Sequence, residues 1–313
     1  MTVCDRIFGF FLATGIVAAI TVLAFGMLIC KGPSQGLKET FVMTLVETRR
    51  FDFVPRIFLR HDEIEEMHLA SKGDADSVMD SSLINISTEE NKDQTDDYGL
   101  VDEDGDGIIL ETVKGSGYVG YMMIVQDPSR LMMGTPKKFG YAGLTVEDMV
   151  ATYDCVAGVN GGGFEDPNGM GRGGIPKGMI VLDGKPDYYI EGRSYEFVGF
   201  DDEYVLHTGK MTAKDVVEKN IQFGCSFGPV LLVNGEEVSI DIFSGVTPRT
   251  AIGQRADGAV LLLVVDGRQA YSLGATYEDL AQIMLVYGAV NAYRGNMREL
   301  PFIGKIRLIH DDD

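Results

Sequence analysis

The stretch Pro229-Val230-Leu231-Leu232-Val233-Asn234-Gly235 indicates the fold class most directly. An uncharged apolar run ends in Asn-Gly, and both of these residues tolerate the left-handed backbone of a two-residue hairpin turn. Two further apolar runs, residues 178–182 and 259–265, are each followed by Asp-Gly. The sequence therefore predicts short strands in largely antiparallel pairing.

Helical patterns lie between these strands. Three threonines each precede such a pattern and are followed three residues later by an aspartate: Thr145 with Asp148, Thr212 with Asp215, and Thr276 with Asp279. Threonine caps a helix N-terminus, and an acidic residue in the first turn favours the helix dipole. Helices and strands alternate without a regular βαβ repeat, which predicts an α+β fold with one globular domain of mixed, largely antiparallel sheet.

An uncharged apolar run covers residues 7–29. At about 1.5 Å per helical residue, such a run crosses a hydrocarbon core of about 30 Å. A secretory signal peptide is the alternative, but the run is longer than a usual signal core and no A-x-A-like cleavage site follows. We expect a single-pass anchor at residues 7–30 in the cell membrane, residues 1–6 in the cytoplasm and an extracytoplasmic domain.

Acidity is concentrated in one part of the chain. Residues 61–111 hold 17 acidic residues and two lysines, whereas the whole chain has a net charge of −20. We expect residues 31–111 to form a juxtamembrane segment and solvated acidic stalk, followed by a globular domain at 112–313. General nucleic-acid binding requires a basic surface, which a chain this acidic lacks. We therefore expect no nucleic-acid partner.

The sequence gives little indication of a metal-binding site or a reactive thiol. Residues 102–109 resemble the first half of a calcium-binding EF-hand loop, but position 12 would be Val113, where a bidentate glutamate is needed. We expect neither a metal nor a cofactor. Cys155 and Cys225 either pair or remain free thiols, and His207 is expected to be structural.

The first candidate site segment is Val159-Asn160-Gly161-Gly162-Gly163-Phe164-Glu165-Asp166, in which Asp166 is a second potential acid or base beside Glu165. Its glycines let a ligand approach the backbone closely, and consecutive N–H groups can bind an anion. Asn160 offers a donor and an acceptor, and Glu165 offers an acid or base. A glycine-rich turn without chemistry is the alternative.

Three further segments carry candidate groups: Ser226-Phe227-Gly228-Pro229, residues 247–253 with Arg249 and Thr250, and residues 264–268 with Asp266 and Arg268. A planar guanidinium suits bidentate recognition of phosphate or carboxylate. Each arginine can equally be a surface charge or a structural ion pair, and Asp266 can be a turn residue.

In this order, these segments resemble the phosphodiester glycosidase family over roughly residues 112–292. The matching pieces are Asn160-Gly161-Gly162, Ser226-Phe227-Gly228-Pro229, Arg249-Thr250-Ala251-Ile252-Gly253, Asp266-Gly267-Arg268 and residues 288–292. The family includes the enzyme that uncovers mannose 6-phosphate and bacterial membrane-anchored proteins linked to exopolysaccharide metabolism.

The resemblance implies hydrolysis of a sugar-1-phosphodiester on its glycosidic side, with a carbohydrate phosphate as substrate. An oxocarbenium-like centre needs a nearby carboxylate, and the departing phosphate needs cationic or N–H donors. The implied carboxylates are Asp266 and Glu165. The implied substrate-binding residues are Asn160, Gly161, Gly162, Arg249, Thr250 and Arg268.

The chain departs from the family after Asn291-Ala292. The family continues with Asn-Leu-Asp-Gly-Gly and serines, whereas this chain continues Tyr293-Arg294-Gly295-Asn296. The C-terminal part is therefore expected to be atypical or truncated, with a strand within residues 304–310. A sequence error, a natural pseudoenzyme, or replacement of the missing groups by Arg294 and Asn296 would each explain the departure. A catalytically inactive carbohydrate- or phosphate-binding module and an envelope-assembly module remain the alternatives to an enzyme.

Overall fold

The computed structural model describes residues 3–48, 51–70, 79–86, 96, 98–136, 138–140, 142–165, 171–239, 244–295 and 303–306. Internal contacts divide the chain into two compact units. The first contains residues 1–71 and 241–246, and the second contains residues 72–240 and 247–313. Each unit is described by itself.

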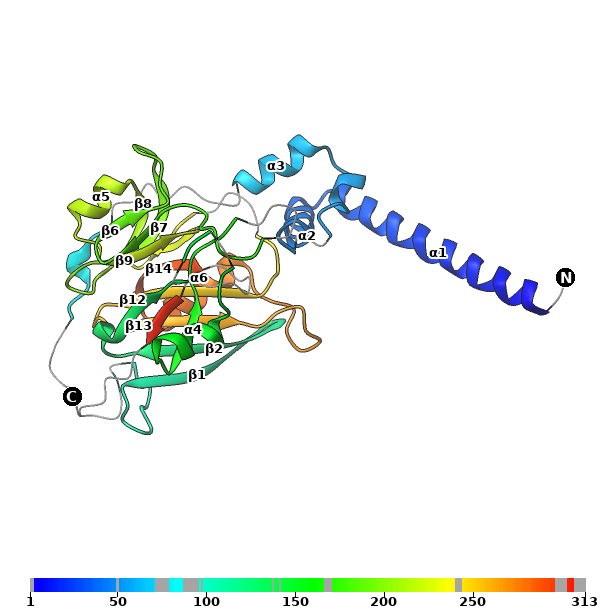
Figure 1. Ribbon diagram of the computed structural model, residues 1–313. Coiled ribbons are helices and arrows are strands. Elements are labelled where there is room, and N and C mark those ends of the chain that lie inside the picture. The colour runs from blue at the N-terminus through cyan, green and yellow to red at the C-terminus, as the bar shows by residue number, and fades with distance from the viewer. Residues whose placement is uncertain are drawn as a thin grey trace. The chain divides into compact units, whose positions relative to one another are not determined.

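The first unit is helical (Figure 1). It contains α1 (Val3–Lys31), α2 (Gln35–Thr48), the 3-10 turn η1 (Pro55–Ile57) and α3 (His61–Ala70). The part of α1 from Ile7 to Lys31 is long and apolar enough to cross a membrane, and a signal sequence meets the same criterion. A small apolar core joins the C-terminal end of α1 to α2 and α3 through Cys30, Val42, Met43, Leu59, Ile64 and Met67.

The second unit contains the strands. Its largest sheet has seven strands in the order β1 (Ile108–Gly115), β2 (Tyr118–Val125), β13 (Val260–Val265), β12 (Arg249–Arg255), β14 (Ala289–Gly295), β10 (Val230–Val233) and β11 (Glu236–Glu237). A five-stranded sheet has the order β6 (Lys185–Asp187), β5 (Ile180–Leu182), β9 (Phe223–Ser226), β7 (Tyr195–Phe200) and β8 (Leu206–Met211). All described pairs in both sheets are antiparallel, which confirms the predicted α+β class.

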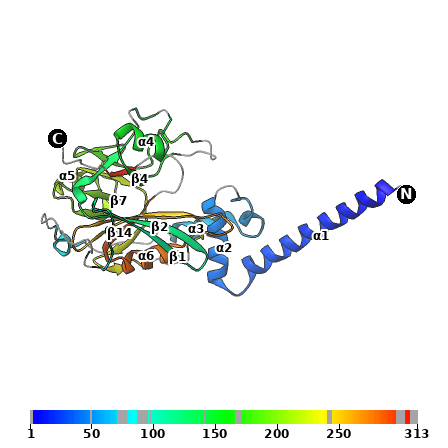
Figure 2. The same cartoon turned by 90° about the horizontal axis from the view of Figure 1, so that it is seen from below.

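The two sheets enclose a core and are covered by helices on their outer faces (Figures 1 and 2). Val260, Leu262 and Tyr293 of the larger sheet share this core with Ile180 and Phe200 of the smaller one. On its other face, the larger sheet packs on α6 (Tyr277–Val286), and the smaller sheet packs on α5 (Ala213–Glu218). The second unit is therefore layered helix, sheet, sheet, helix.

A small third sheet completes this unit. It has the order β3 (Leu131–Gly134), β15 (Ile303–Ile306) and β4 (Ala157–Asn160), and β3 follows the 3-10 turn η3 (Pro128–Arg130). The C-terminal strand expected within residues 304–310 is thus present at Ile303–Ile306, and residues 307–313 lie outside the described residues. β15 pairs antiparallel with both neighbours, so the tail contributes a central strand.

The predicted turns and caps are confirmed. Asn234 and Gly235 have φ of 56° and 80°, the left-handed pair that a type I′ hairpin requires. Asp183 and Gly184, between β5 and β6, likewise have φ of 49° and 72°. The predicted caps begin α4 (Val146–Tyr153), α5 and α6, where the threonine hydroxyl accepts the N–H of the aspartate three residues later.

Residues before β1 pack on the sheet at several points. The N–H of Asn85 donates to the carbonyl of Ala256 at 2.7 Å, shortly after the 3-10 turn η2 (Ser81–Leu83). Ile86 contacts Gly258 closely enough that a Cβ there would lie 2.8 Å from its side chain. The sheet itself begins at Ile108. The boundary predicted at residue 112 stays a prediction. The described residues 79–86, 96 and 98–107 of the acidic segment belong to the second unit.

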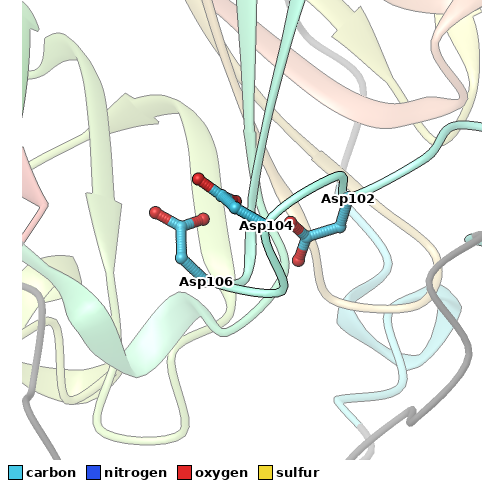
Figure 3. Close-up of side chains that lie close together, drawn as sticks. All are labelled: Asp102, Asp104 and Asp106. Atoms are coloured by element: carbon cyan, nitrogen blue, oxygen red, sulfur yellow. The ribbon is translucent and has the colours of Figure 1, made fainter.

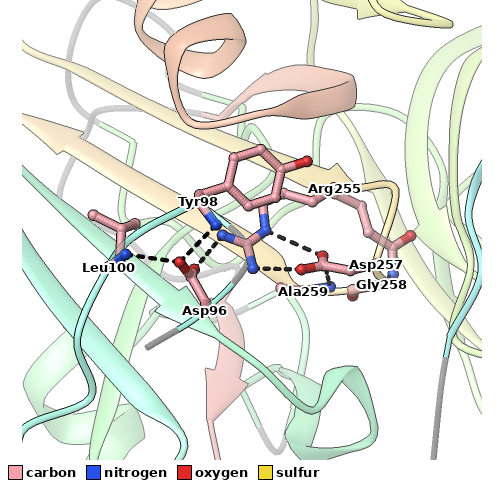
Figure 4. A network of polar contacts seen from close by, with 8 residues as sticks. Asp96, Tyr98, Leu100, Arg255, Asp257, Gly258 and Ala259 are labelled. Carbon is pink, nitrogen blue, oxygen red and sulfur yellow. Dashed lines mark hydrogen bonds and ion pairs between the residues drawn. The ribbon is translucent and has the colours of Figure 1, made fainter. Parts of the chain in front are cut away.

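A buried ion-pair network fixes this segment (Figure 4). Arg255, at the end of β12, has a side chain only 1% exposed and donates to Asp96 at 2.6 Å and to Asp257 at 2.5 Å. Its guanidinium carbon lies 4.1 Å from the ring centroid of Tyr98. Asp96 also accepts the N–H of Leu100 at 2.8 Å. The network explains why an acidic residue of the predicted stalk is enclosed, because its charge is neutralised by an arginine from the sheet.

Asp96→Asn is expected to lower the free energy of unfolding by about 3 kcal/mol, because it leaves the Arg255 charge buried without one of its counter-ions. Urea unfolding of the full chain, followed by circular dichroism, measures this change. Glu218→Gln is the matched control, since the Lys214–Glu218 pair is exposed on both sides and should change stability by less than about 0.5 kcal/mol. Equal losses in the two variants would contradict this role for Asp96.

Candidate active site

Four of the strands that carry candidate residues meet at one end of the seven-stranded sheet. β12 begins at Arg249 opposite Val265, the last residue of β13, and Thr250 pairs with Gly295, the last residue of β14. β10 begins just after the Ser226–Pro229 segment, and the carbonyl of Pro229 accepts the N–H of Arg294 at 3.0 Å. The antiparallel order therefore gathers segments that are far apart in the sequence.

The glycine-rich segment approaches this end from β4. A Cβ at Gly295 would lie 2.6 Å from the carbonyl oxygen of Asn160, and a Cβ at Gly163 would lie 2.6 Å from the ring of Phe227. The N–H of Gly163 donates to the carbonyl of Ser226 at 3.4 Å. These contacts allow no side chain, so the glycines permit close packing of the Asn160–Gly163 backbone against the Ser226–Pro229 segment and the end of β14.

Arg249 is completely buried. Its exposed fraction is 0%, its Nε donates to the carbonyl of Ala275 at 3.0 Å, and its guanidinium carbon lies 4.3 Å from the ring centroid of Tyr277 on α6. Because strand residues alternate between faces, Arg249 shares the α6 face with Ala251, whereas Thr250 points to the opposite face. Direct contact between Arg249 and a phosphate would require the enclosing residues, among them Ala275 and Tyr277, to move away from its guanidinium group.

Asp266 and Arg268 follow β13 at the same end of the sheet. Asp266 is half-buried; its N–H donates to the carbonyl of Val119 at 2.9 Å, and its Oδ2 accepts the hydroxyl of Tyr271 at 3.2 Å. Arg268 is exposed and has a left-handed φ of 58°. A Cβ at Gly267 would lie 2.5 Å from the backbone nitrogen of Pro248, so this turn packs against the segment that leads into β12. A carboxylate and an exposed guanidinium thus lie two residues apart beside β12.

The remaining predicted residues occupy two places. Glu165 is exposed, and its N–H donates to the carbonyl of Ile175 at 2.8 Å. Thr250 is buried, and the side-chain Oδ1 of Asn160 is enclosed without a hydrogen-bond partner among the described residues. The structure therefore places Asn160, Gly161, Gly162 and Thr250 near the end of β14, and Glu165 further along the same loop.

A mainly apolar cavity of about 50 Å³ lies beneath the glycine-rich segment. Asn160, Gly161 and Gly295 line it together with Cys225 and Tyr293. A cavity holds a water molecule from about 10–15 Å³ upward. This space accordingly suits ordered water or one small group, and a whole sugar ring must bind outside it.

Residues 153–294 match the family model described as phosphodiester glycosidase. This region belongs to the phosphodiester glycosidase family. The resemblance inferred from the sequence motifs is thereby confirmed.

Known proteins that are similar to this chain include one from Bacillus subtilis and one from zebrafish. The SPbeta prophage-derived uncharacterized protein YomE of Bacillus subtilis (strain 168) is 27% identical over 175 residues, which are 53% of this chain and 26% of that protein. The match thus spans about a quarter of that curated relative. The zebrafish N-acetylglucosamine-1-phosphodiester alpha-N-acetylglucosaminidase catalytic domain, auto-inhibited by its pro-peptide, has 19% identity and a TM-score of 0.52 over 64% of this chain and 82% of that structure. The second similarity shows the fold.

Sequence reasoning missed one positioning contact in this phosphodiester glycosidase domain. The hydroxyl of Tyr293 accepts the N–H of Phe227 at 2.7 Å and donates to the carbonyl of Glu196 at 3.1 Å. Burial raises the pKa of Tyr293 well above its ordinary value, so the hydroxyl stays protonated and can donate at neutral pH. Tyr293 therefore ties the Ser226–Pro229 segment to β7.

Arg294 holds the same segment from the other face of β14. Its Nη1 donates to the carbonyl of Gly228 at 3.2 Å, and its guanidinium carbon lies 4.7 Å from the ring centroid of Phe227 and 5.0 Å from that of Tyr277. Arg249 lies over the ring of Tyr277 as well. No sequence motif marked this arrangement, because it depends on which strands become neighbours.

The segment that resembles the first half of an EF-hand loop gathers three carboxylates, from Asp102, Asp104 and Asp106 (Figure 3). Their ligand atoms lie within 4.8 Å of one another. Asp102 is buried and already accepts the N–H groups of Gly105 at 3.0 Å and Gly107 at 2.8 Å. Val113, at the position where an EF-hand needs a glutamate, is a buried apolar residue of β1. These aspartates are the described residues that come nearest to a metal-binding set.

The structure also shows the surroundings of Cys155, Cys225 and His207. Cys155 and Cys225 are free in the structure, so the predicted alternative of a disulfide between them is not formed. Burial raises the pKa of Cys225 to about 12, which keeps it a thiol at neutral pH. The Nε2 atom of His207 lies 2.7 Å from Oδ2 of Asp201. Burial raises the pKa of Asp201, but hydrogen bonds from His207 and the backbone outweigh this effect, so the pKa is lowered overall.

Tyr293→Phe is expected to lower the free energy of unfolding by about 1–3 kcal/mol, because the N–H of Phe227 loses its buried acceptor. The amide of Phe227 should also exchange faster with deuterium. Urea unfolding and hydrogen exchange measure the two effects. Tyr287→Phe, on the half-buried tyrosine that follows the last residue of α6, is the control and should change neither quantity appreciably. Unchanged exchange at Phe227 in Tyr293→Phe would show that Tyr293 does not hold this segment.

Proposed function

We propose that this chain is a membrane-anchored, extracytoplasmic phosphodiester glycosidase that hydrolyses a sugar-1-phosphodiester in envelope or exopolysaccharide metabolism. The observation that carries this proposal is the meeting of Asn160–Gly163, Ser226–Pro229, Thr250 and Asp266–Arg268 around one end of the large sheet of a family domain. The zebrafish protein of the same fold is described as acting on an N-acetylglucosamine-1-phosphodiester, which supports this class of substrate.

The reaction breaks the bond between the anomeric carbon and the phosphate oxygen. Water attacks the anomeric carbon, and the bonding electrons leave with the phosphate, which departs as a monoester. The anomeric centre becomes oxocarbenium-like, and a nearby carboxylate stabilises it or accepts the proton of the water. Because a phosphate is a good leaving group, this scheme needs little acid assistance.

In this scheme, Asp266 or Glu165 is the carboxylate. Arg268 offers an exposed guanidinium to the leaving phosphate, and Arg249 adds positive charge behind the ring of Tyr277. Asn160, with the backbone of Gly161 and Gly162, positions the sugar or phosphate oxygens. Thr250 supports this segment from β12, beside Gly295.

The placement outside the cytoplasm rests on the apolar helix. Residues 1–6 would lie in the cytoplasm, residues 7–30 would cross the membrane, and residues 31–111 would connect the anchor to the domain at 112–313. The length and apolar composition of Ile7–Lys31 support this arrangement.

The second candidate function is a carbohydrate- or phosphate-binding module without turnover, and a module of envelope assembly is the other alternative. Two observations favour the binding module: the sequence after Ala292 lacks the Asp-Gly-Gly-Ser element of the family, and Arg249 is enclosed. Such a module would bind the sugar phosphate but would not release sugar from it.

The proposed chemistry is tested with full chain purified in detergent and two probes, a methyl N-acetylglucosamine-1-phosphodiester and a phosphomannan. Free sugar released over time is measured for wild type, Asp266→Asn, Glu165→Gln and the exposed control Asp202→Asn. The wild type should release sugar, and loss of the essential carboxylate should lower kcat/KM by roughly a hundredfold or more. The control should retain full activity.

Three other results are decisive. If wild type releases sugar and the Asp266→Asn and Glu165→Gln variants both release it at the same rate, the proposed carboxylate roles are wrong. Full turnover by Arg249→Ala, with folding checked by circular dichroism, would overturn the role of Arg249. Binding of either probe without release of sugar would replace the enzyme by the binding module.

A further inference from the structure

Aromatic side chains gather on the surface where the connection between β6 and β7 lies. Tyr188 and Tyr189 are 37% and 39% exposed. The ring of Phe139 meets that of Tyr188 edge to face, with centroids 5.0 Å apart. We call Phe139, Tyr188 and Tyr189 the aromatic platform. Neighbouring exposed aromatic rings are costly to leave in water and commonly mark a binding surface.

The platform is held in place by its own loop. Tyr188 has a left-handed φ of 55°, which is unfavourable for a bulky residue, and its N–H donates to the carboxylate of Asp187 at 2.7 Å. The hydroxyl of Tyr195 accepts the N–H of Ile190 at 2.8 Å, and Arg193 lies over the ring of Tyr195 at 5.2 Å. Strain of this kind persists where a fixed side-chain position is useful, and fixed aromatic rings lose little entropy on binding.

The platform is continuous with the glycine-rich segment of the candidate active site. Gly140, next to Phe139, donates its N–H to the carbonyl of Gly174 at 2.7 Å. The following residues pair with the site loop: the carbonyl of Ile175 accepts the N–H of Glu165, and the N–H of Lys177 donates to the carbonyl of Gly163 at 2.9 Å. One segment, residues 174–177, therefore connects the platform to the loop that carries Glu165.

Positive charge borders the platform in a chain whose net charge is −20. Lys177 is exposed on the connecting segment, Arg172 is exposed shortly before it, and Arg193 is exposed on the loop of the tyrosines. Two carboxylates lie in the same region: Asp187, the last residue of β6, accepts the N–H of Tyr188, and Glu191 is exposed on the loop. The surface thus combines aromatic faces with guanidinium and ammonium groups, which complements a sugar chain that carries phosphate.

We propose that the aromatic platform is a binding subsite for a pyranose chain carrying phosphodiesters. The apolar C–H face of a pyranose ring stacks on Tyr188 and Tyr189, the tyrosine hydroxyls bond to its hydroxyl edges, and Arg172 and Arg193 meet its phosphates. The chain then continues toward the Asn160–Glu165 loop, where the susceptible phosphodiester lies. This inference deepens the proposed function and rests on it for the class of ligand.

The test uses full chain in detergent and two probes, a phosphomannan and a mannan of matched length that carries no phosphate. Isothermal titration calorimetry measures binding for wild type, Tyr188→Asn/Tyr189→Ala and the control Tyr204→Asn. Tyr204 is matched to Tyr188, since it is 36% exposed and has a φ of 61° in another turn. Asparagine tolerates this backbone conformation, so neither substitution adds strain.

Wild type should bind phosphomannan more tightly than the phosphate-free mannan. The double variant should weaken phosphomannan binding roughly tenfold, whereas Tyr204→Asn should leave it unchanged. Unaltered affinity in the double variant, an equal loss in Tyr204→Asn, or no binding of either probe by wild type would overturn the subsite.

Sugar release, measured separately on the small methyl phosphodiester, distinguishes the two proposals. This probe carries a single sugar, which on this proposal occupies the reaction centre alone, so the double variant should hydrolyse it as fast as wild type. If wild type releases no sugar from this probe but still binds phosphomannan in a way that depends on Tyr188 and Tyr189, the catalytic proposal is wrong and the subsite proposal holds. Slower release by the double variant would show that the tyrosines act within the reaction centre, and would overturn their role as a separate subsite.

Discussion

The hydrogen bonding of β12 to both β13 and β14 is the constraint on which the rest of the second unit depends. Because strand side chains alternate, this register sends Arg249 and Ala251 toward α6 and Thr250 and Ile252 toward the core between the sheets. A slip of one residue would bury the wrong face of the strand. The register also places Arg249 at the end where the candidate segments meet, and Arg255 at the other end, where the acidic segment is held.

The two ends of β12 use buried guanidinium groups differently. At the far end, Arg255 is neutralised by Asp96 and Asp257 and covered by Tyr98, which binds residues before β1 to the sheet. At the site end, Arg249 and Arg294 lie over the ring of Tyr277, and Arg294 holds the carbonyl of Gly228. A guanidinium stacked on an aromatic ring keeps its charge with less desolvation cost, and its planar donors fix neighbouring carbonyls. The site end is thus a rigid frame around a cationic centre.

Local signals predicted the elements of this fold well. The Asn234-Gly235 turn, the Thr276 cap and the apolar run of β13 each depend on residues close in sequence, and the structure confirms them. Pairing between distant segments left no such signal. The burial of Asp96 depends on an arginine 159 residues away. The contact of Tyr293 with Phe227 depends on the pairing of β14 with β10, the strand that begins shortly after Phe227. The motif order indicated which candidate segments belong together, but not that Arg249 faces α6 while Asn160 faces the other side.

The most direct measurement of the central claim is the position of bond cleavage. Wild-type full chain would hydrolyse the methyl N-acetylglucosamine-1-phosphodiester in water labelled with the heavy oxygen isotope, and mass spectrometry would locate the label in the products. Attack at the anomeric carbon predicts label in the released sugar and none in the methyl phosphate. Label in the phosphate, or no cleavage of this probe or of phosphomannan, would contradict the account.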